Sequence, residues 1–166
     1  MIHKLIEKLD QKFTFEEAHA HCDVPCGIYD PITAQLGALT VVRMLDLMAA
    51  KDAEAGEKGA AYHNSMTRYA LVKEEHAEKV KAEIRVIWGD FFKAPQFEQF
   101  PDAHTLVHKI MLLGSKARQT TDREAAVQLV EAVNEFAEMF WKVKGLGTHR
   151  AKYPMAPNLE LVYPNL

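Results

Sequence analysis

Apolar side chains recur at helical spacing along most of the chain after residue 31. The first such segment covers about residues 32–51, and it begins where Asp30 and Pro31 supply an N-cap and a proline at the first helical position. Its apolar stripe is wide, which predicts a helix that is covered on two sides. The stripe consists of Ile32, Leu36, Leu39, Val41, Val42, Met44, Leu45, Leu47 and Met48.

Three further amphipathic segments are predicted, over about residues 60–92, over about 102–117, and from about 121 onward. The second has a charged face that is expected to be solvated and includes Lys73, Glu74, Glu78, Lys79, Lys81 and Glu83. Prolines break the chain over 93–101, and Thr121 with Glu124 has the spacing of a capping box. Gly145 ends the last helix. The pattern therefore predicts an all-α protein, a four-helix bundle over residues 32–145.

The two ends of the chain differ from the bundle. The tail, 146–166, is apolar but contains three prolines, so it is expected to pack as an extended arm, and no strands are expected anywhere. Residues 1–20 place apolar side chains on one helical face, but charges interrupt them, so they do not form a secretory signal. They end in the small residues of Ala18-His19-Ala20. A first helix and a removable leader both suit this segment, and the residues that follow favour the leader.

Composition narrows the class of protein. The chain has 166 residues with 48% apolar and 26% charged side chains, as expected for one globular domain. A net charge of −3 gives no electrostatic footprint for nucleic acid. No apolar run approaches the roughly 20 residues of a transmembrane helix, so no membrane partner is expected. Two cysteines are too few for a disulfide scaffold, and their closeness favours a metal site or a redox pair.

The bundle itself does not contain a recognisable metal motif. Di-metal bundles carry Glu-x-x-His pairs, and no histidine of the predicted helices has an acidic residue three positions before it. His104 and His108 are spaced to share a helical face, but only Asp102 supports them nearby. They are interpreted as surface or interface histidines, and His63 and His76 in the same way.

The chemistry-bearing residues lie between the leader and the bundle. A cut before His21 would create a free amine beside an imidazole, followed by the thiols of Cys22 and Cys26. Amine, the intervening amide nitrogen and a thiolate form fused five-membered chelate rings, which favour a square plane. Square-planar nitrogen and sulfur coordination suits Ni(II) or Cu(II) better than zinc. Pro25 and Gly27 would bend the loop so that the second thiolate closes the plane, leaving the His21 imidazole an axial approach.

This donor set also indicates a reaction. Thiolates and a deprotonated amide stabilise the higher oxidation state of nickel and bring the couple into the biological range. A one-electron couple beside an open axial side suits chemistry on a small radical anion such as superoxide.

The sequence at this point resembles the nickel-containing superoxide dismutases, in a precursor form with a leader. Residues 21–31, hereafter the hook, are similar to that family's nickel-binding motif and have the sequence HCDVPCGIYDP. The segment 88–101 resembles the family's turn between its second and third helices and has the sequence WGDFFKAPQFEQFP. The resemblance covers roughly residues 21–144.

The resemblance implies a processed nickel enzyme. A peptidase would cut between Ala20 and His21, leaving a domain of residues 21–166. One nickel ion per chain would be held by the His21 amine, the Cys22 amide and the thiolates of Cys22 and Cys26, with the His21 imidazole axial in the oxidised state. The enzyme would convert superoxide and protons into dioxygen and hydrogen peroxide by cycling Ni(II) and Ni(III), as a cytoplasmic homohexamer.

The same resemblance assigns roles around the metal. Tyr29 matches a tyrosine that stands over the open face, and Asp23 matches an acid that follows the first cysteine. The chain departs from the family pattern at Phe91, where a second tyrosine is expected, and at Gly37 and His76, where a glutamate and an arginine would steady the axial imidazole. His76 is therefore a candidate substitute partner for that imidazole.

Two other functions remain open at this stage. The chain could be a metal-binding or thiol-sensing bundle without turnover, or an uncleaved inactive precursor, because an uncut chain lacks the His21 amine. A thiol–disulfide enzyme is disfavoured, since three residues separate the cysteines and no βαβ context is predicted.

Overall fold

The computed structural model describes residues 27–166 as a helical bundle with a small sheet attached. The leader and hook residues 21–26 lie outside the described residues. The elements are α2 (Ile32–Ala53), α3 (Ala60–Val86), η1 (Ile87–Phe91), α4 (Ala94–Gln99), α5 (Ala103–Gln119), α6 (Arg123–Val143), β1 (Thr148–Lys152) and β2 (Glu160–Pro164). The predicted all-α four-helix bundle is confirmed, formed by α2, α3, α5 and α6.

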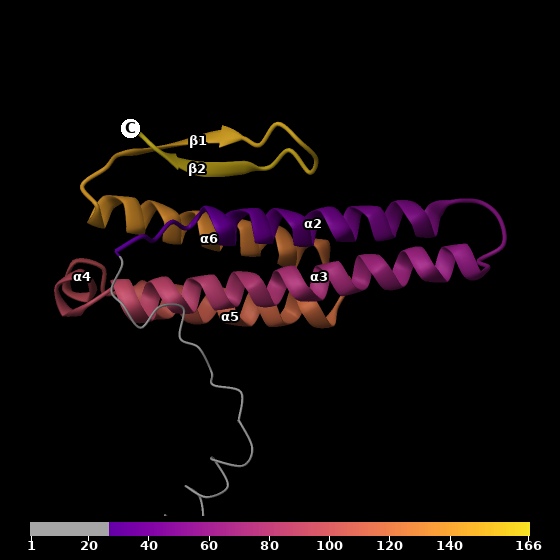
Figure 1. The fold of residues 1–166 in the computed structure, drawn as a ribbon, viewed down its shortest axis with the longest axis horizontal. Coiled ribbons are helices and arrows are strands. Elements are labelled where there is room, and N and C mark those ends of the chain that lie inside the picture. The colour runs from indigo at the N-terminus through magenta and orange to yellow at the C-terminus, as the bar shows by residue number, and fades with distance from the viewer. Residues whose placement is uncertain (1–26) are drawn as a thin grey trace, which may run out of the picture.

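The four long helices pack in a closed arrangement, in which α2 and α5 each contact both α3 and α6. Figure 1 shows that α2 and α3 extend beyond the other pair at the end where the α2–α3 loop lies. In the view of Figure 1, α4 and the end of α6 lie at the opposite end, and the chain enters α2 from that side. The described part of the hook, residues 27–31, therefore lies at the end remote from the α2–α3 loop.

Helix α2 supplies much of the core because its apolar side chains point in several directions. Its fully buried side chains include Ala34, Ala38, Val41 and Val42. By length and composition alone α2 is apolar enough to cross a membrane, contrary to the expectation that no such run exists. A core helix passes the same test, and 44% of the most apolar window of α2 is buried inside this bundle.

The end of α3 differs from the expected regular helix. Its last turn widens into the π-helical turn η1, where the Phe92 amide donates to the Ile87 carbonyl at 3.2 Å. Such turns are often found at functional sites. The expectation of an irregular turn over 93–101 is also wrong in part, because α4 forms there. Its start is stabilised by the Gln96 side chain, which accepts from the Lys93 amide at 3.0 Å.

Helix α6 begins with a different cap from the one predicted. The Asp122 carboxylate, and not the Thr121 hydroxyl, accepts the Ala125 amide, at 3.1 Å. The carboxylate also binds the Lys116 ammonium at 2.6 Å. The hydrogen bond from Lys116, followed by that from Ala125, lowers the pKa of Asp122. An ionised carboxylate is a stronger cap at a helix N-terminus than a hydroxyl, which explains the shift by one residue.

The tail is extended, as predicted, but the expectation that the chain has no strands is wrong. Strands β1 and β2 pair as an antiparallel hairpin, in register from Thr148 opposite Pro164 to Lys152 opposite Glu160. Figure 1 shows the hairpin lying over α2 and α6, outside the bundle. Leu161 and Val162, which belong to β2, are buried. The sequence did not predict this pairing because Pro154, Pro157 and Pro164 interrupt the alternation of apolar and polar residues that marks a hairpin.

An ion-pair cluster also attaches the hairpin to α6. The Arg150 guanidinium of β1 donates to both Glu131 carboxylate oxygens at 2.7 and 2.9 Å, and to Glu138 at 2.9 Å. The two glutamates raise the pKa of Arg150, Glu131 contributing most. This bidentate geometry fixes the orientation of β1 along α6.

Lys73 is the one residue of the charged α3 face that the structure buries, with only 4% of its surface exposed. Its ammonium donates to the carbonyls of Arg118 and Thr120, each at 2.7 Å. Burial lowers the pKa of this lysine. Lys73 therefore closes the C-terminal end of α5, where backbone carbonyls lack helical partners and the helix dipole favours a cation.

We expect Lys73→Met to lower the free energy of unfolding by about 1–3 kcal/mol, because buried carbonyls lose their charged donor. Urea unfolding followed by circular dichroism measures this change. The exposed Lys79 on the same helix provides the control, and Lys79→Met should change stability by less than about 0.5 kcal/mol. Equal effects of the two substitutions would show that Lys73 does not act as a cap.

Candidate metal centre

The described chain begins at Gly27, directly after the last predicted nickel ligand. Gly27 has a φ of +71°, in the left-handed region that favours glycine. Among residues 29–166, no atom lies within 4 Å of where a β-carbon would stand, so the positive φ is the reason that favours glycine here. The residue thus provides the turn by which the chain leaves Cys26, in agreement with the predicted bend.

The hook joins α2 through a tight set of backbone contacts. Pro31, and not Asp30 as predicted, is the N-cap residue of α2, although the Asp30 carboxylate does accept the Ile32 amide at 2.8 Å. The Pro31 carbonyl accepts the Gln35 amide at 3.0 Å, and Pro31 is buried. The C-terminal end of the hook is therefore fixed to the first turn of α2.

Tyr29 lies against an aromatic cluster at this end of the bundle. Its ring centroid is 5.6 Å from that of Phe91, which in turn lies 4.8 Å from Phe140 and 5.6 Å from Phe92. The Lys144 ammonium stands 5.7 Å from the Phe91 ring centroid, a cation–π contact. The structure thus brings together Tyr29 and Phe91, the position at which the family pattern has a second tyrosine.

A small hollow of about 200 Å³ lies between the described end of the hook and the end of α3. Its lining residues are Ile28, Tyr29, Asp30, Thr33, Glu83, Val86 and Ile87. Ile28 is 79% exposed at its rim. The segment that follows Cys26 therefore runs beside α3, close to the π-helical turn.

The structure also brings together Gly37 and His76, the two positions that depart from the family pattern. A β-carbon on Gly37 would lie 2.9 Å from a Val80 methyl carbon and 3.4 Å from the His76 carbonyl oxygen. The glycine lets α2 and α3 approach closely, so a glutamate at position 37 would require a shift of α3. The two departures thus belong to one local packing arrangement.

The hydrogen bond of His76 fixes its tautomer. Nδ1 lies 2.9 Å from the Val72 carbonyl oxygen, which can only accept, so Nδ1 carries a proton. In the neutral ring, Nε2 then holds a lone pair and can accept a hydrogen bond from another group. His76 is half-buried beside α2, so its position suits an accepting partner.

His104 has a more specific environment than the surface role predicted for it, although it is exposed. Its ring stacks on Phe97 with centroids 4.2 Å apart, and its Nδ1 accepts the Trp88 indole N–H at 3.1 Å. The aromatic sequence around 88–101 contained a signal for this contact. Within residues 27–166, no group of three or more His, Cys, Asp or Glu side chains is placed to hold a metal.

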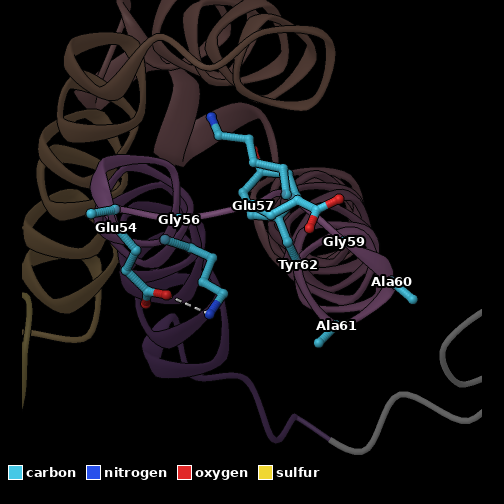
Figure 2. Close-up of a pocket in the computed structure, with 10 residues that line it drawn as sticks. Glu54, Gly56, Glu57, Gly59, Ala60, Ala61 and Tyr62 are labelled. Atoms are coloured by element: carbon cyan, nitrogen blue, oxygen red, sulfur yellow. Dashed lines mark hydrogen bonds and ion pairs between the residues drawn. The ribbon is translucent and has the colours of Figure 1, made fainter.

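A second hollow lies at the α2–α3 loop, at the other end of α2 from residues 27–31 (Figure 2). It measures about 260 Å³ and is lined by residues 51–62 with the exception of Asp52 and Ala53. Its polar contacts include the ion pair between Lys51 and Glu54 at 2.6 Å. The lining contains neither histidine nor cysteine, so this hollow is not a candidate metal centre.

The predicted ligands His21, Cys22 and Cys26, and the predicted site residue Asp23, lie outside the described residues. Their chemistry can still be compared with what a metal would require. An amine, an amide nitrogen and two thiolates form a donor set suited to nickel, and Gly27 and Pro31 attach it to a rigid helix. The residues present therefore fit a nickel ion at this end of the bundle.

The chain is similar to proteins of one known family. The family described as nickel-containing superoxide dismutase matches residues 16–144, which include the whole hook and all four bundle helices. The "Superoxide dismutase [Ni]" of Streptomyces seoulensis is 35% identical over 125 residues, covering 75% of this chain and 88% of that protein. The protein of the same name from Streptomyces coelicolor is 33% identical over an alignment of the same length.

Solved structures show the same relationship. A nickel-containing superoxide dismutase with nickel ligation corresponding to the oxidised state is 34% identical, with a TM-score of 0.67. A native nickel superoxide dismutase structure is 31% identical, with a TM-score of 0.66. Each alignment covers 75% of this chain and 99% of the other. The chain belongs to the family of nickel-containing superoxide dismutases.

Proposed function

We propose that this chain, once cut between Ala20 and His21, is a nickel-dependent superoxide dismutase whose metal is held by His21, Cys22 and Cys26. Membership of the family implies one nickel ion per chain and superoxide as the substrate. The observation that carries the proposal is the family match across the hook, joined to a bundle whose first helix begins directly after it. The reaction takes two superoxide ions and two protons to one dioxygen and one hydrogen peroxide.

The nickel supplies a one-electron couple when it is bound, and the protein supplies the surroundings. Tyr29 is proposed to be part of these surroundings, and this role is supported by the aromatic cluster behind it, which limits where its ring can lie. Its hydroxyl can order superoxide or water and can donate a hydrogen bond to an anion. Asp23 follows the first thiolate and is proposed to steady the loop that carries it.

His76 is proposed as the partner that steadies the His21 imidazole. Its Nδ1 proton is engaged by the Val72 carbonyl, so Nε2 is the nitrogen left to accept an imidazole N–H.

Processing, assembly and location complete the proposal. A peptidase removes residues 1–20, since only a free amine at His21 completes the donor set. The mature chain of residues 21–166 assembles as a homohexamer in the cytoplasm. These three statements rest on the resemblance of the hook and bundle to the family. The alternative of a metal-binding or thiol-sensing bundle without turnover is not favoured by family membership.

Cys22→Ser and Cys26→Ser should each lower dismutase activity by more than about 100-fold, because each removes a thiolate ligand, and ligands matter more than the partners that orient them. The helical circular dichroism signal should stay unchanged, since the bundle core consists of residues after 31. Thr67→Ser, on an exposed face of α3, is the control and should keep full activity. Retained activity in either cysteine variant would refute the ligand assignment.

His76→Ala should lower activity by about tenfold and alter the electron paramagnetic resonance spectrum of the bound nickel, because the imidazole loses its orienting partner. His63 is an exposed histidine of the same helix near the α2–α3 loop, so His63→Ala should change neither quantity. If His76→Ala leaves both the activity and the spectrum unchanged, another group steadies His21.

A further inference from the structure

The C-terminal hairpin is an addition to the part of the chain that the family shares. The family match ends at residue 144, and the hairpin begins at Thr148. The solved relatives are matched over 99% of their own length by 75% of this chain. The role of the hairpin must therefore be sought in its own contacts.

The hairpin is attached to α2 through a buried glutamine. Gln35 is only 1% exposed, and its side-chain NH₂ donates to the Val162 carbonyl of β2 and to the Asn134 amide oxygen of α6, each at 3.0 Å. One side chain of α2 thus bonds both the hairpin and the neighbouring helix α6.

Asn134 completes this attachment from α6. It is also 1% exposed, and its NH₂ donates to the Glu160 carbonyl at 2.8 Å. Its oxygen accepts the Val162 amide at 3.3 Å in addition to the Gln35 side chain. The two amides therefore bind three backbone groups of β2 and each other, and we call Gln35 and Asn134 the amide pair.

The amide pair fixes the position of β2 relative to α2 and α6 more specifically than apolar packing alone would. A buried amide without partners is costly, whereas a fully bonded one permits only the arrangement that satisfies it. Within the described chain, no buried side-chain nitrogen or oxygen lacks a partner. A slip of β2 along α2 and α6 would break several of these bonds together.

The amide pair acts at the turn of α2 that carries the hook. The backbone amide of Gln35 donates to the Pro31 carbonyl at 3.0 Å, and the Asp30 carboxylate accepts the Ile32 amide of the same turn. Gln35 therefore joins the hairpin to Pro31, the last residue of the hook.

We propose that the C-terminal hairpin is a clamp that fixes the first turn of α2 and thereby positions the nickel-binding hook, with Gln35 and Asn134 as positioning residues. The inference rests on the proposed function, since it concerns the same metal site. It adds to that site a part of the chain that lies beyond the family match.

The test compares Gln35→Met with Leu45→Ala in the cleaved, nickel-loaded protein. Methionine keeps the length and apolar stem of glutamine but cannot donate, so the contacts to Val162 and Asn134 are lost. Leu45 is 4% exposed, on the same helix but further from the hook, and its truncation destabilises the core without touching the amide pair. Gln35→Asn, too short to reach both acceptors, replaces Gln35→Met if that variant does not fold.

Three quantities are measured, each at a temperature the same number of degrees below the Tm of the variant. Transfer of nickel to a chelator should be about tenfold faster in Gln35→Met than in the parent, with a changed nickel resonance spectrum, and unchanged in Leu45→Ala. Backbone hydrogen exchange at residues 28–36 should also rise only in Gln35→Met. This last readout does not depend on the metal.

Equal nickel loss and equal exchange in the two variants would overturn the clamp and leave the hairpin a role in general stability. Unchanged exchange and nickel retention in Gln35→Met would overturn it as well. A parent protein that binds no nickel would refute the proposed function, while the exchange comparison would still decide whether the hairpin holds the first turn of α2.

Discussion

The structure depends on the need to cover α2, whose apolar side chains point in more directions than one neighbouring helix can bury. Helices α3 and α6 cover two sides of it, and the C-terminal hairpin lies over the side between α2 and α6. Burial of apolar surface is the dominant favourable term in folding, and α2 contributes Ala34, Ala38, Leu39, Val41, Val42 and Leu45 to the buried core. The polar groups that accompany them, Gln35 and Asn134, are bonded, so this burial also fixes the position of the hairpin.

This arrangement suits a metal site made from the start of a chain. A terminal amine can be a ligand only if the chain begins there, so the ligands cannot come from the middle of a helix. The bundle must instead hold the residues just after the ligands. Three contacts hold these residues. The Asp30 carboxylate accepts the Ile32 amide, the Pro31 carbonyl accepts the Gln35 amide, and the Tyr29 ring packs on Phe91.

Local patterns predicted the bundle and the candidate site, whereas contacts between distant segments escaped prediction. Helical periodicity located the four helices, and the donor types of the hook indicated nickel. The buried role of Lys73 was hidden because its carbonyl partners lie on α5, and the β1–β2 pairing was hidden by prolines in the connecting turn. The cap at Asp122 depended on Lys116 and the adjoining backbone. The close approach at Gly37 of α2 depended on the position of α3. These features arise from tertiary packing, to which a single sequence pattern gives no direct access.

The proposed function requires that the mature chain starts at His21 and carries its metal there. Native intact mass spectrometry of the protein purified from its own cells reports the cleavage point, the bound metal and the assembly in one measurement. We expect chains that begin at His21, each with one nickel ion. Full-length chains that begin at Met1 and carry no metal would contradict the proposed function.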